Sequence, residues 1–140
     1  QTAAIRDGCL QRVRYTGALL QQPIRMKVYA NGIRLTFSAA LDKKIAEDIE
    51  SWSLEQWNYK WTSAYGSKDW SVKNPTKQGR DVIVIQSAKL LSDGKSVFLQ
   101  MPVQPVHSMA IQYNLDAATG KIFKGTLHLT INKMGDRFAE

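Results

Sequence analysis

Short runs in which apolar and polar residues alternate make up most of the chain. Turn residues separate these runs at fairly even spacing, and long stretches with helical periodicity are absent. Alternation with a period of two places every second side chain on the same face of an extended strand. The pattern predicts an all-β sandwich or barrel of about seven strands. The strands fall at 24–29, 33–37, from 52 onward, 82–88, 97–101, 109–113 and 126–132, with a run of mixed faces at 9–15 that fits an edge strand.

The strongest short-range signal is Asn31-Gly32, which lies between two alternating runs. Both residues tolerate the positive φ of a type I′ turn, so the pair predicts a tight β-hairpin. In the second arm of this hairpin Ile33, Leu35 and Phe37 share one face. We expect that face to pack into the core.

A short polar segment at 43–50 follows the hairpin. Leu41, Ile45 and Ile49 recur at every fourth position there, which is a helical spacing. Asp42 precedes the segment, and its carboxylate could accept hydrogen bonds from the free amides of the first turn. We expect one or two turns of helix that cross between the sheets.

The stretch from residue 52 to residue 81 holds all four tryptophans of the chain and few aliphatic residues. Trp52 opens a strand, and we expect it to be a core residue. Beyond it, three rings alternate with polar residues, so an extended strand would carry them on one face. The candidate ligand-binding residues are Trp57, Tyr59, Trp61, Tyr65 and Trp70. Exposed rings can stack on sugars or on partner side chains, whereas packing between the sheets is the competing interpretation.

Polar groups that a sugar-binding surface would need are available beside these rings. They are Glu55, Gln56, Asn58 and Asp69. This local composition leaves carbohydrate binding open as a function of the aromatic segment.

The charge balance favours acidic partners, because 19 Lys and Arg stand against 12 Asp and Glu. Nucleic acid, an anionic polysaccharide or an acidic protein face would each satisfy that preference. The basic residues are scattered and never form a run of five or more, which is typical of a solvated surface. We therefore do not expect nucleic acid to be the partner. No apolar stretch is long enough to predict a membrane span.

No arrangement of residues in the sequence indicates catalysis. The single cysteine, Cys9, excludes an internal disulfide and a thiolate zinc cage. The two histidines, His107 and His128, lack a metal-ligand spacing, and strand positions explain them and the nearby Met101 and Met109 more simply. Nucleophile–base sets and glycine-rich phosphate loops are absent. We expect no enzymatic activity, no metal and no cofactor.

Six segments, taken in chain order, form a more specific pattern. They are Asn31-Gly-Ile-Arg-Leu-Thr-Phe-Ser38, Leu41-Asp42, Trp52-Ser-Leu54, Ile85-Gln-Ser-Ala-Lys-Leu90, Ser92-Asp-Gly-Lys-Ser-Val-Phe-Leu99 and Ile111-Gln-Tyr113. This pattern resembles the bacterial immunoglobulin-like (Ig-like) domains of the S-layer type. The resemblance covers residues 24–132 and is interrupted by a long aromatic insertion at 55–80.

A second, shorter resemblance lies at the N-terminus. Asp7-Gly-Cys-Leu-Gln-Arg-Val-Arg-Tyr15 is similar to the closing strand of β-propeller dehydrogenase domains. In large modular bacterial proteins such propellers can be followed by an Ig-like domain and then by a c-type cytochrome domain.

Together the resemblances imply an Ig-like β-sandwich at 21–135, an N-terminal arm or remnant of a preceding domain at 1–20, and a tail at 136–140. They imply an accessory role in domain packing or protein interaction within a larger secreted or periplasmic protein. The expected partners are neighbouring propeller or cytochrome domains, and no catalytic residue carries over. The alternative is a carbohydrate-binding module that uses an exposed aromatic surface, with a polysaccharide as partner.

Overall fold

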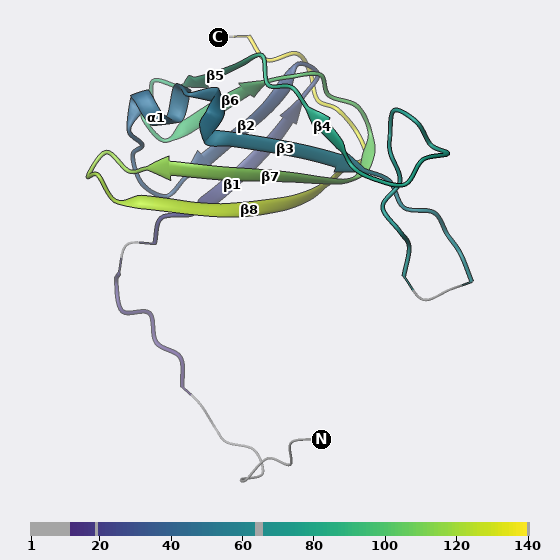
Figure 1. The fold of residues 1–140 in the computed structure, drawn as a ribbon. Coiled ribbons are helices and arrows are strands. Elements are labelled where there is room, and N and C mark those ends of the chain that lie inside the picture. Colours follow the sequence, from purple (N-terminus) through teal and green to yellow (C-terminus); the bar gives the residue numbers. More distant parts are fainter. Residues whose placement is uncertain (1–11, 19, 64–65, 140) are drawn as a thin grey trace.

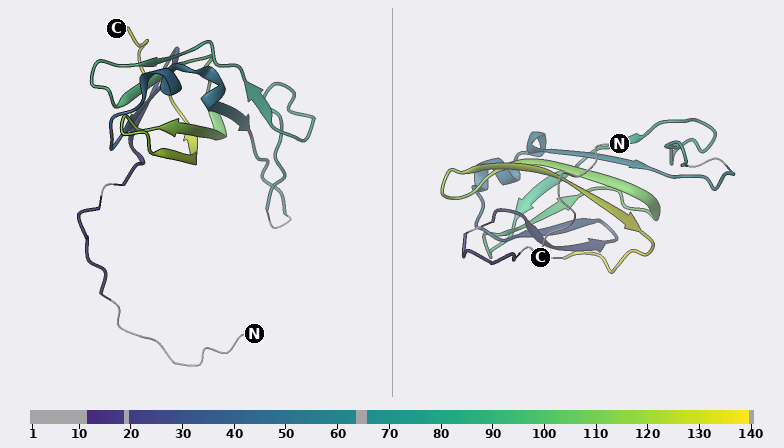
Figure 2. Two further views of the ribbon diagram at one scale, coloured as in Figure 1. Left: turned by 60° about the vertical axis from the view of Figure 1, so that its left-hand side comes forward. Right: turned by 90° about the horizontal axis from the view of Figure 1, so that it is seen from below.

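The chain folds into two antiparallel β-sheets that pack face to face (Figures 1 and 2). The computed structural model describes residues 12–18, 20–63 and 66–139. The first sheet has the order β1 (Pro23–Tyr29), β2 (Gly32–Phe37), β6 (Ser96–Gln100) and β5 (Ser87–Leu90). The second has the order β4 (Asp81–Ile83), β3 (Trp52–Trp57), β7 (Val106–Asp116) and β8 (Ile122–Ile131). The predicted all-β sandwich is confirmed, with eight strands in the described part of the chain.

The core lies between the two sheets and consists of the inward-facing side chains of both. Ile33, Leu35 and Phe37 are completely buried, and Trp52 is 5% exposed. The Phe37 ring lies 6.3 Å from the Trp52 ring and 5.5 Å from the Tyr113 ring of the opposite sheet. The predictions that Ile33, Leu35, Phe37 and Trp52 are core residues are therefore confirmed.

The hairpin at Asn31-Gly32 is present, but the predicted turn type is wrong. The loop consists of Ala30 and Asn31, while Gly32 already belongs to β2 and pairs with Tyr29. Neither Asn31 nor Gly32 has a positive φ. A Cβ at Gly32 would collide with the Leu99 carbonyl oxygen and lie 2.6 Å from the Phe98 ring. Glycine is needed here because the neighbouring strand comes so close.

The predicted helical turns lie at one end of the sandwich (Figure 1). They form α1 (Lys43–Glu47) and a 3₁₀ turn, η1 (Ile49–Ser51). The Asp42 carboxylate accepts a hydrogen bond of 3.0 Å from a backbone amide of the first turn, as expected. The Trp52 indole N–H donates to the Ala46 carbonyl oxygen at 3.1 Å, which ties the helix to the core.

The apolar run at 82–88 is not one buried strand, as the sequence pattern had indicated. It divides into β4 and β5, which lie at the edges of different sheets, so the chain crosses the sandwich between them. Val82 and Val84 are 62% and 75% exposed, whereas Ile83 and Ala88 are buried. Val82 faces outward from β4, and Val84 lies in the crossing between β4 and β5, so both side chains remain in contact with water.

The predicted strand at 9–15 is not found in its described part. Residues 12–15 form no strand, and Val13 and Tyr15 are 95% and 84% exposed. Residues 9–11 lie outside the described residues. The described part of this arm runs away from the sandwich (Figure 1).

The last residues of the chain pack on the outer face of the first sheet. The Phe138 ring stacks on Phe98 at 4.2 Å and meets the Tyr29 ring edge-on at 5.1 Å. The Asn31 side chain donates to the Phe138 carbonyl oxygen at 3.1 Å and accepts from the Phe138 amide at 2.7 Å. The Phe98 side chain points away from the core. It is only 5% exposed because Phe138 covers it.

Candidate functional site

The aromatic insertion projects beyond the end of the sandwich that lies opposite α1 (Figures 1 and 2). Strand β3 ends at Trp57, and the backbones of Asn58 and Trp70 then exchange two hydrogen bonds of 2.8 Å. Trp70 also bridges to Gln78, so the insertion forms two loops that meet at Trp70. The predicted continuous strand through Trp57, Tyr59 and Trp61 is wrong, because the chain leaves the sheet after the first of these rings.

The Asp81 carboxylate holds the second loop at its base. It accepts hydrogen bonds from the Ser71 hydroxyl at 2.8 Å, the Val72 amide at 2.7 Å and the Lys73 amide at 2.9 Å. Partial burial by itself raises the pKa of Asp81, but the bonds from Lys73, Ser71 and Val72 outweigh it and hold that pKa below its ordinary value. The ionised carboxylate therefore stabilises the loop.

We expect Asp81→Asn to loosen the second loop without unfolding the sandwich. Loss of a charged acceptor should raise the hydrogen-exchange rates of the Val72 and Lys73 amides by about tenfold. Since the folded pKa is lowered, the stabilisation is fully present above the unfolded value and disappears as the pH falls through the folded value. Exchange measured by NMR from neutral pH to below pH 3.8 should show the same loosening in the unmodified chain.

Asp116→Asn is the matched control, because the Asp116 carboxylate accepts no hydrogen bond within the described residues. It should leave the exchange of the Val72 and Lys73 amides unchanged. Equal exchange rates in Asp81→Asn and in the unmodified chain would show that Asp81 does not hold the loop.

One face of the Trp57 ring is covered by a cation of the same chain. The Arg80 guanidinium lies 3.9 Å from the ring centroid, a distance at which a cation–π contact is favourable. Asp69 and Glu55 accept hydrogen bonds from Arg80 at 2.7 Å and 3.4 Å, and chiefly the bond that Arg80 donates to Asp69 raises the pKa of Arg80. The His128 ring meets Trp57 at 6.3 Å in a T-shaped arrangement.

Two further rings are engaged in a similar way. The Lys60 ammonium lies 3.5 Å from the centroid of Trp70. The Tyr59 ring packs against His107 at 4.3 Å, and the Tyr59 amide donates to Nδ1 of the same histidine at 3.2 Å. These contacts leave Trp57 and Trp70 only partly accessible, whereas Tyr59 is 53% exposed.

Trp61 differs from these rings because 97% of its surface is exposed. It borders a hollow of about 440 Å³ that Trp57, Tyr59 and Lys60 also line. Tyr65, the remaining candidate, lies outside the described residues. The insertion thus brings Trp57, Tyr59 and Trp61 around one hollow but leaves the indole of Trp61 free.

The polar groups that a sugar would need beside these rings are already engaged or buried. Glu55 and Asp69 neutralise Arg80, and Gln56 is 5% exposed. The Asn58 side-chain oxygen accepts a hydrogen bond of 3.0 Å from the His107 amide. The geometry of the insertion therefore favours a contact surface for a protein over a sugar-binding surface.

Four residues that cover the rings were not identified as partners from the sequence. They are Lys60, Arg80, His107 and His128. The histidines stand about fifty residues or more beyond the rings they contact, and no local pattern joins them. Only the return of the chain from β7 and β8 beside β3 brings them together.

Within the described residues, no group of three or more His, Cys, Asp or Glu is placed to hold a metal ion. Met101 and Met109 are core residues, 1% and 0% exposed. No helix in the described ranges is both long and apolar enough to cross a membrane.

Comparison with known proteins supports the fold. No protein-family model and no curated protein sequence matches the chain. The structure of the surface layer protein SbsC, domains 1–6, is similar with a TM-score of 0.56 and 17% identity, covering 84% of this chain and 14% of that chain. CopC from Methylosinus trichosporium OB3b has a TM-score of 0.43 and 12% identity, over 86% of this chain and 99% of CopC.

The chain spans only a small part of the surface layer protein that it resembles. At this level of identity the likeness concerns the fold alone. Together with the two four-stranded antiparallel sheets and the short helix in the connection from β2 to β3, it shows that the domain is an immunoglobulin-like β-sandwich.

Proposed function

We propose that this chain is a non-catalytic accessory domain that docks on a neighbouring protein surface through its aromatic insertion, with Trp61 as the central contact. The observation that carries the proposal is the 97% exposure of Trp61, which lies on the loop between the paired residues Asn58 and Trp70. The other described rings of the insertion, Trp57, Tyr59 and Trp70, each contact a group of the same chain. A free indole offers a large apolar area to a partner, and tryptophan is enriched among the residues that dominate binding energy.

The construction of the insertion supports this role. The hydrogen bonds between Asn58 and Trp70 hold the base of the first loop, and those to Asp81 hold the base of the second, before any partner arrives. A surface that is ordered in advance loses less conformational entropy on binding. Lys60 and Lys68 lie on the loop that carries Trp61, so a partner surface with acidic groups around an apolar pocket would fit best.

The partner we propose is a neighbouring domain of a larger secreted or periplasmic protein, of the propeller or cytochrome type. The sequence resemblance at residues 7–15 and 24–132 supports this context. The likeness to one part of a structure that comprises several domains of a surface layer protein agrees with it.

Hydroxyl-radical footprinting tests the proposal on this 140-residue chain and on the longer protein that contains it. We expect oxidation of Trp61 to fall at least about fivefold in the longer protein, because a docked central tryptophan is almost completely desolvated. Met26, which is 40% exposed at the edge of the first sheet, should be oxidised equally in both.

Two variants of the longer protein complete this experiment. Trp61→Ala should release the contact and increase the oxidation of Tyr59, whereas Ile122→Ala, a change at the exposed first residue of β8, should not. Oxidation of Trp61 that is the same in the short chain and the longer protein would overturn the proposed function.

A further inference from the structure

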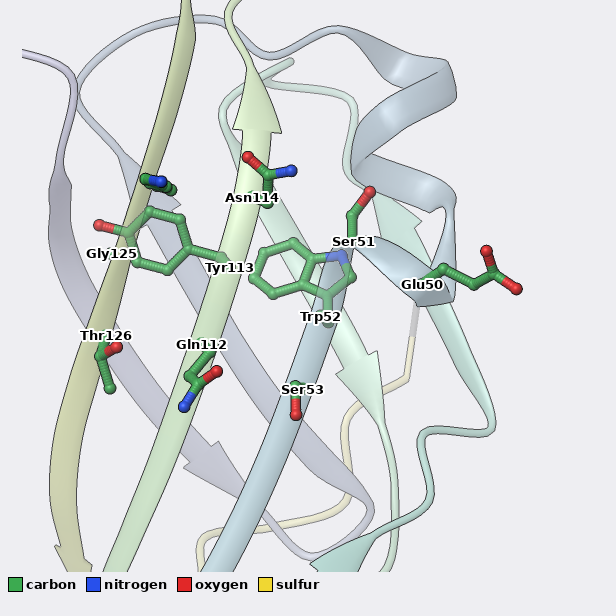
Figure 3. A pocket seen from close by; sticks show the side chains of 10 residues that line it. Glu50, Ser51, Trp52, Ser53, Gln112, Tyr113, Asn114, Gly125 and Thr126 are labelled. Atoms are coloured by element: carbon green, nitrogen blue, oxygen red, sulfur yellow. The ribbon is translucent and has the colours of Figure 1, made fainter.

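A second hollow lies on the outer face of the other end of the second sheet, away from the insertion (Figure 3). Its volume is about 550 Å³, and β3, β7, β8 and the turn η1 contribute to it. Ser53, Gln112 and Thr126 are direct cross-strand neighbours and form a row across three strands. Because strands hold side chains more rigidly than loops do, this row is a fixed set of polar groups.

Four polar side chains of the hollow are not engaged by other side chains or backbone groups of the described residues. No side-chain hydrogen bond within the described residues engages Ser53, Gln112, Asn114 or Thr126. Elsewhere on the sheets, Thr36 bonds to Ser96 and Thr130 bonds to the His107 carbonyl oxygen. Amide and hydroxyl groups both donate and accept hydrogen bonds, so they match a ligand that carries many hydroxyl groups.

Two aromatic rings lie beneath these polar groups, on the inner face of the sheet, because Trp52 is 5% exposed and both rings pack against Phe37 of the opposite sheet. Figure 3 shows Thr126, Gln112 and Ser53 on one side of the two rings and Asn114 and Ser51 on the other. The ring centroids of Trp52 and Tyr113 are 6.4 Å apart. Gly125 leaves room for the Tyr113 hydroxyl, since a Cβ there would lie 2.8 Å from Cζ of the tyrosine. The exposed surface of the hollow is thus formed mainly by hydrogen-bonding side chains.

The charged side chains around the hollow do not favour a highly charged ligand. The protein has a net charge of +7, but the hollow is lined by one cation, Lys124, and one carboxylate, Glu50. A polyanion would meet little attraction there. None of the large exposed apolar side chains lines the hollow, so it also lacks the apolar centre of a typical protein interface.

From this geometry we infer that the hollow binds a neutral oligosaccharide, through Ser53, Gln112, Asn114 and Thr126. The site is separate from Trp61 and does not depend on the proposed docking function. The hydroxyl groups of the sugar would bond to these four side chains.

A glycan array probed with the 140-residue chain tests the inference. The array carries neutral cello-, xylo-, manno- and chito-oligosaccharides, with heparin and polygalacturonate fragments as anionic probes. We expect binding to at least one neutral oligosaccharide, and little change of that binding with salt because no net charge is neutralised. Absence of binding to every neutral probe, or binding to the anionic probes alone, would overturn the inference.

Variants then locate the binding site by calorimetry with the best neutral oligosaccharide. Gln112→Ala and Thr126→Val should each weaken binding by about tenfold, which corresponds to the loss of one or two hydrogen bonds. Gln104→Ala, a matched change at an exposed amide outside the hollow, should have no effect. Because the mutated side chains are exposed, thermal unfolding should be unchanged and will show that each variant is folded.

Trp61→Ala separates this site from the insertion. It should leave sugar binding intact. If Trp61→Ala weakens sugar binding while Gln112→Ala and Thr126→Val do not, the sugar binds at the insertion and the inference about the hollow is wrong.

Discussion

Phe37→Ala is expected to lower the free energy of unfolding by about 3–5 kcal/mol. The Phe37 side chain is completely buried, and its ring lies 5.7 Å from Phe123 as well as against Trp52 and Tyr113. Truncation would remove apolar contacts from both sheets and leave a cavity that the surrounding strands cannot close. Because small domains are stable by only about 5–15 kcal/mol, this loss would leave much of the protein unfolded at elevated temperature.

Urea unfolding followed by tryptophan fluorescence measures this effect, since Trp52 lies beside the mutated position. Ile24→Ala is the control, because Ile24 belongs to the same sheet but is 62% exposed. It should cost no more than about 0.5–1 kcal/mol. A Phe37→Ala protein with a midpoint close to that of the control would show that the core is not centred on this ring.

Gly32→Ala should be the next most damaging change, with an expected loss of about 1–3 kcal/mol. The added methyl group would overlap the Leu99 carbonyl oxygen and the Phe98 ring. The carbonyl belongs to a strand backbone, which cannot turn aside as a flexible side chain can. The expected loss comes from forcing β2 and β6 apart in the middle of the first sheet.

The same urea experiment measures the effect of Gly32→Ala. Ser87→Ala is a suitable control, since Ser87 pairs with Gln100 in the same cross-strand row and is exposed. A Gly32→Ala protein as stable as the control would show that β2 and β6 do not approach each other as closely as the structure has them.

The fold could be predicted largely from local pattern. The alternation of Ile33, Leu35 and Phe37 with polar residues is sufficient to assign one face of β2 to the core, because period two leaves no other arrangement for an amphipathic strand. The Asp42 cap is also a local signal, since its carboxylate bonds to an amide only three residues away. Both predictions are confirmed.

The errors occurred where the outcome depended on a distant part of the chain. Asn31-Gly32 has the composition of a type I′ turn. Residue 32 is glycine for another reason, because the Leu99 carbonyl oxygen comes too close to leave room for a Cβ. The run at 82–88 is apolar enough for a buried strand. It divides because the chain must pass from the second sheet to the first, which no short window of sequence records.

The residues of the candidate site could be predicted from the sequence, but their arrangement in space could not. The rings of the insertion could be named in advance, and Trp57, Tyr59 and Trp61 do line one hollow. Their different exposures could not be predicted, since these depend on Arg80, Lys60 and His107, which reach them only in the folded chain. The hollow on the second sheet had no sequence signal, because Ser53, Gln112 and Thr126 come from three strands.

The sequence by itself determined the class of the fold, the position of the short helix and the face of β2 that packs into the core, because each follows from the periodicity of neighbouring residues along a strand or a turn. Only the tertiary structure decided which tryptophan stays exposed and which polar groups gather into a hollow. Those properties arise where strands distant in the chain become neighbours, and their physical cause is the pairing of β3 with β7 and of β7 with β8.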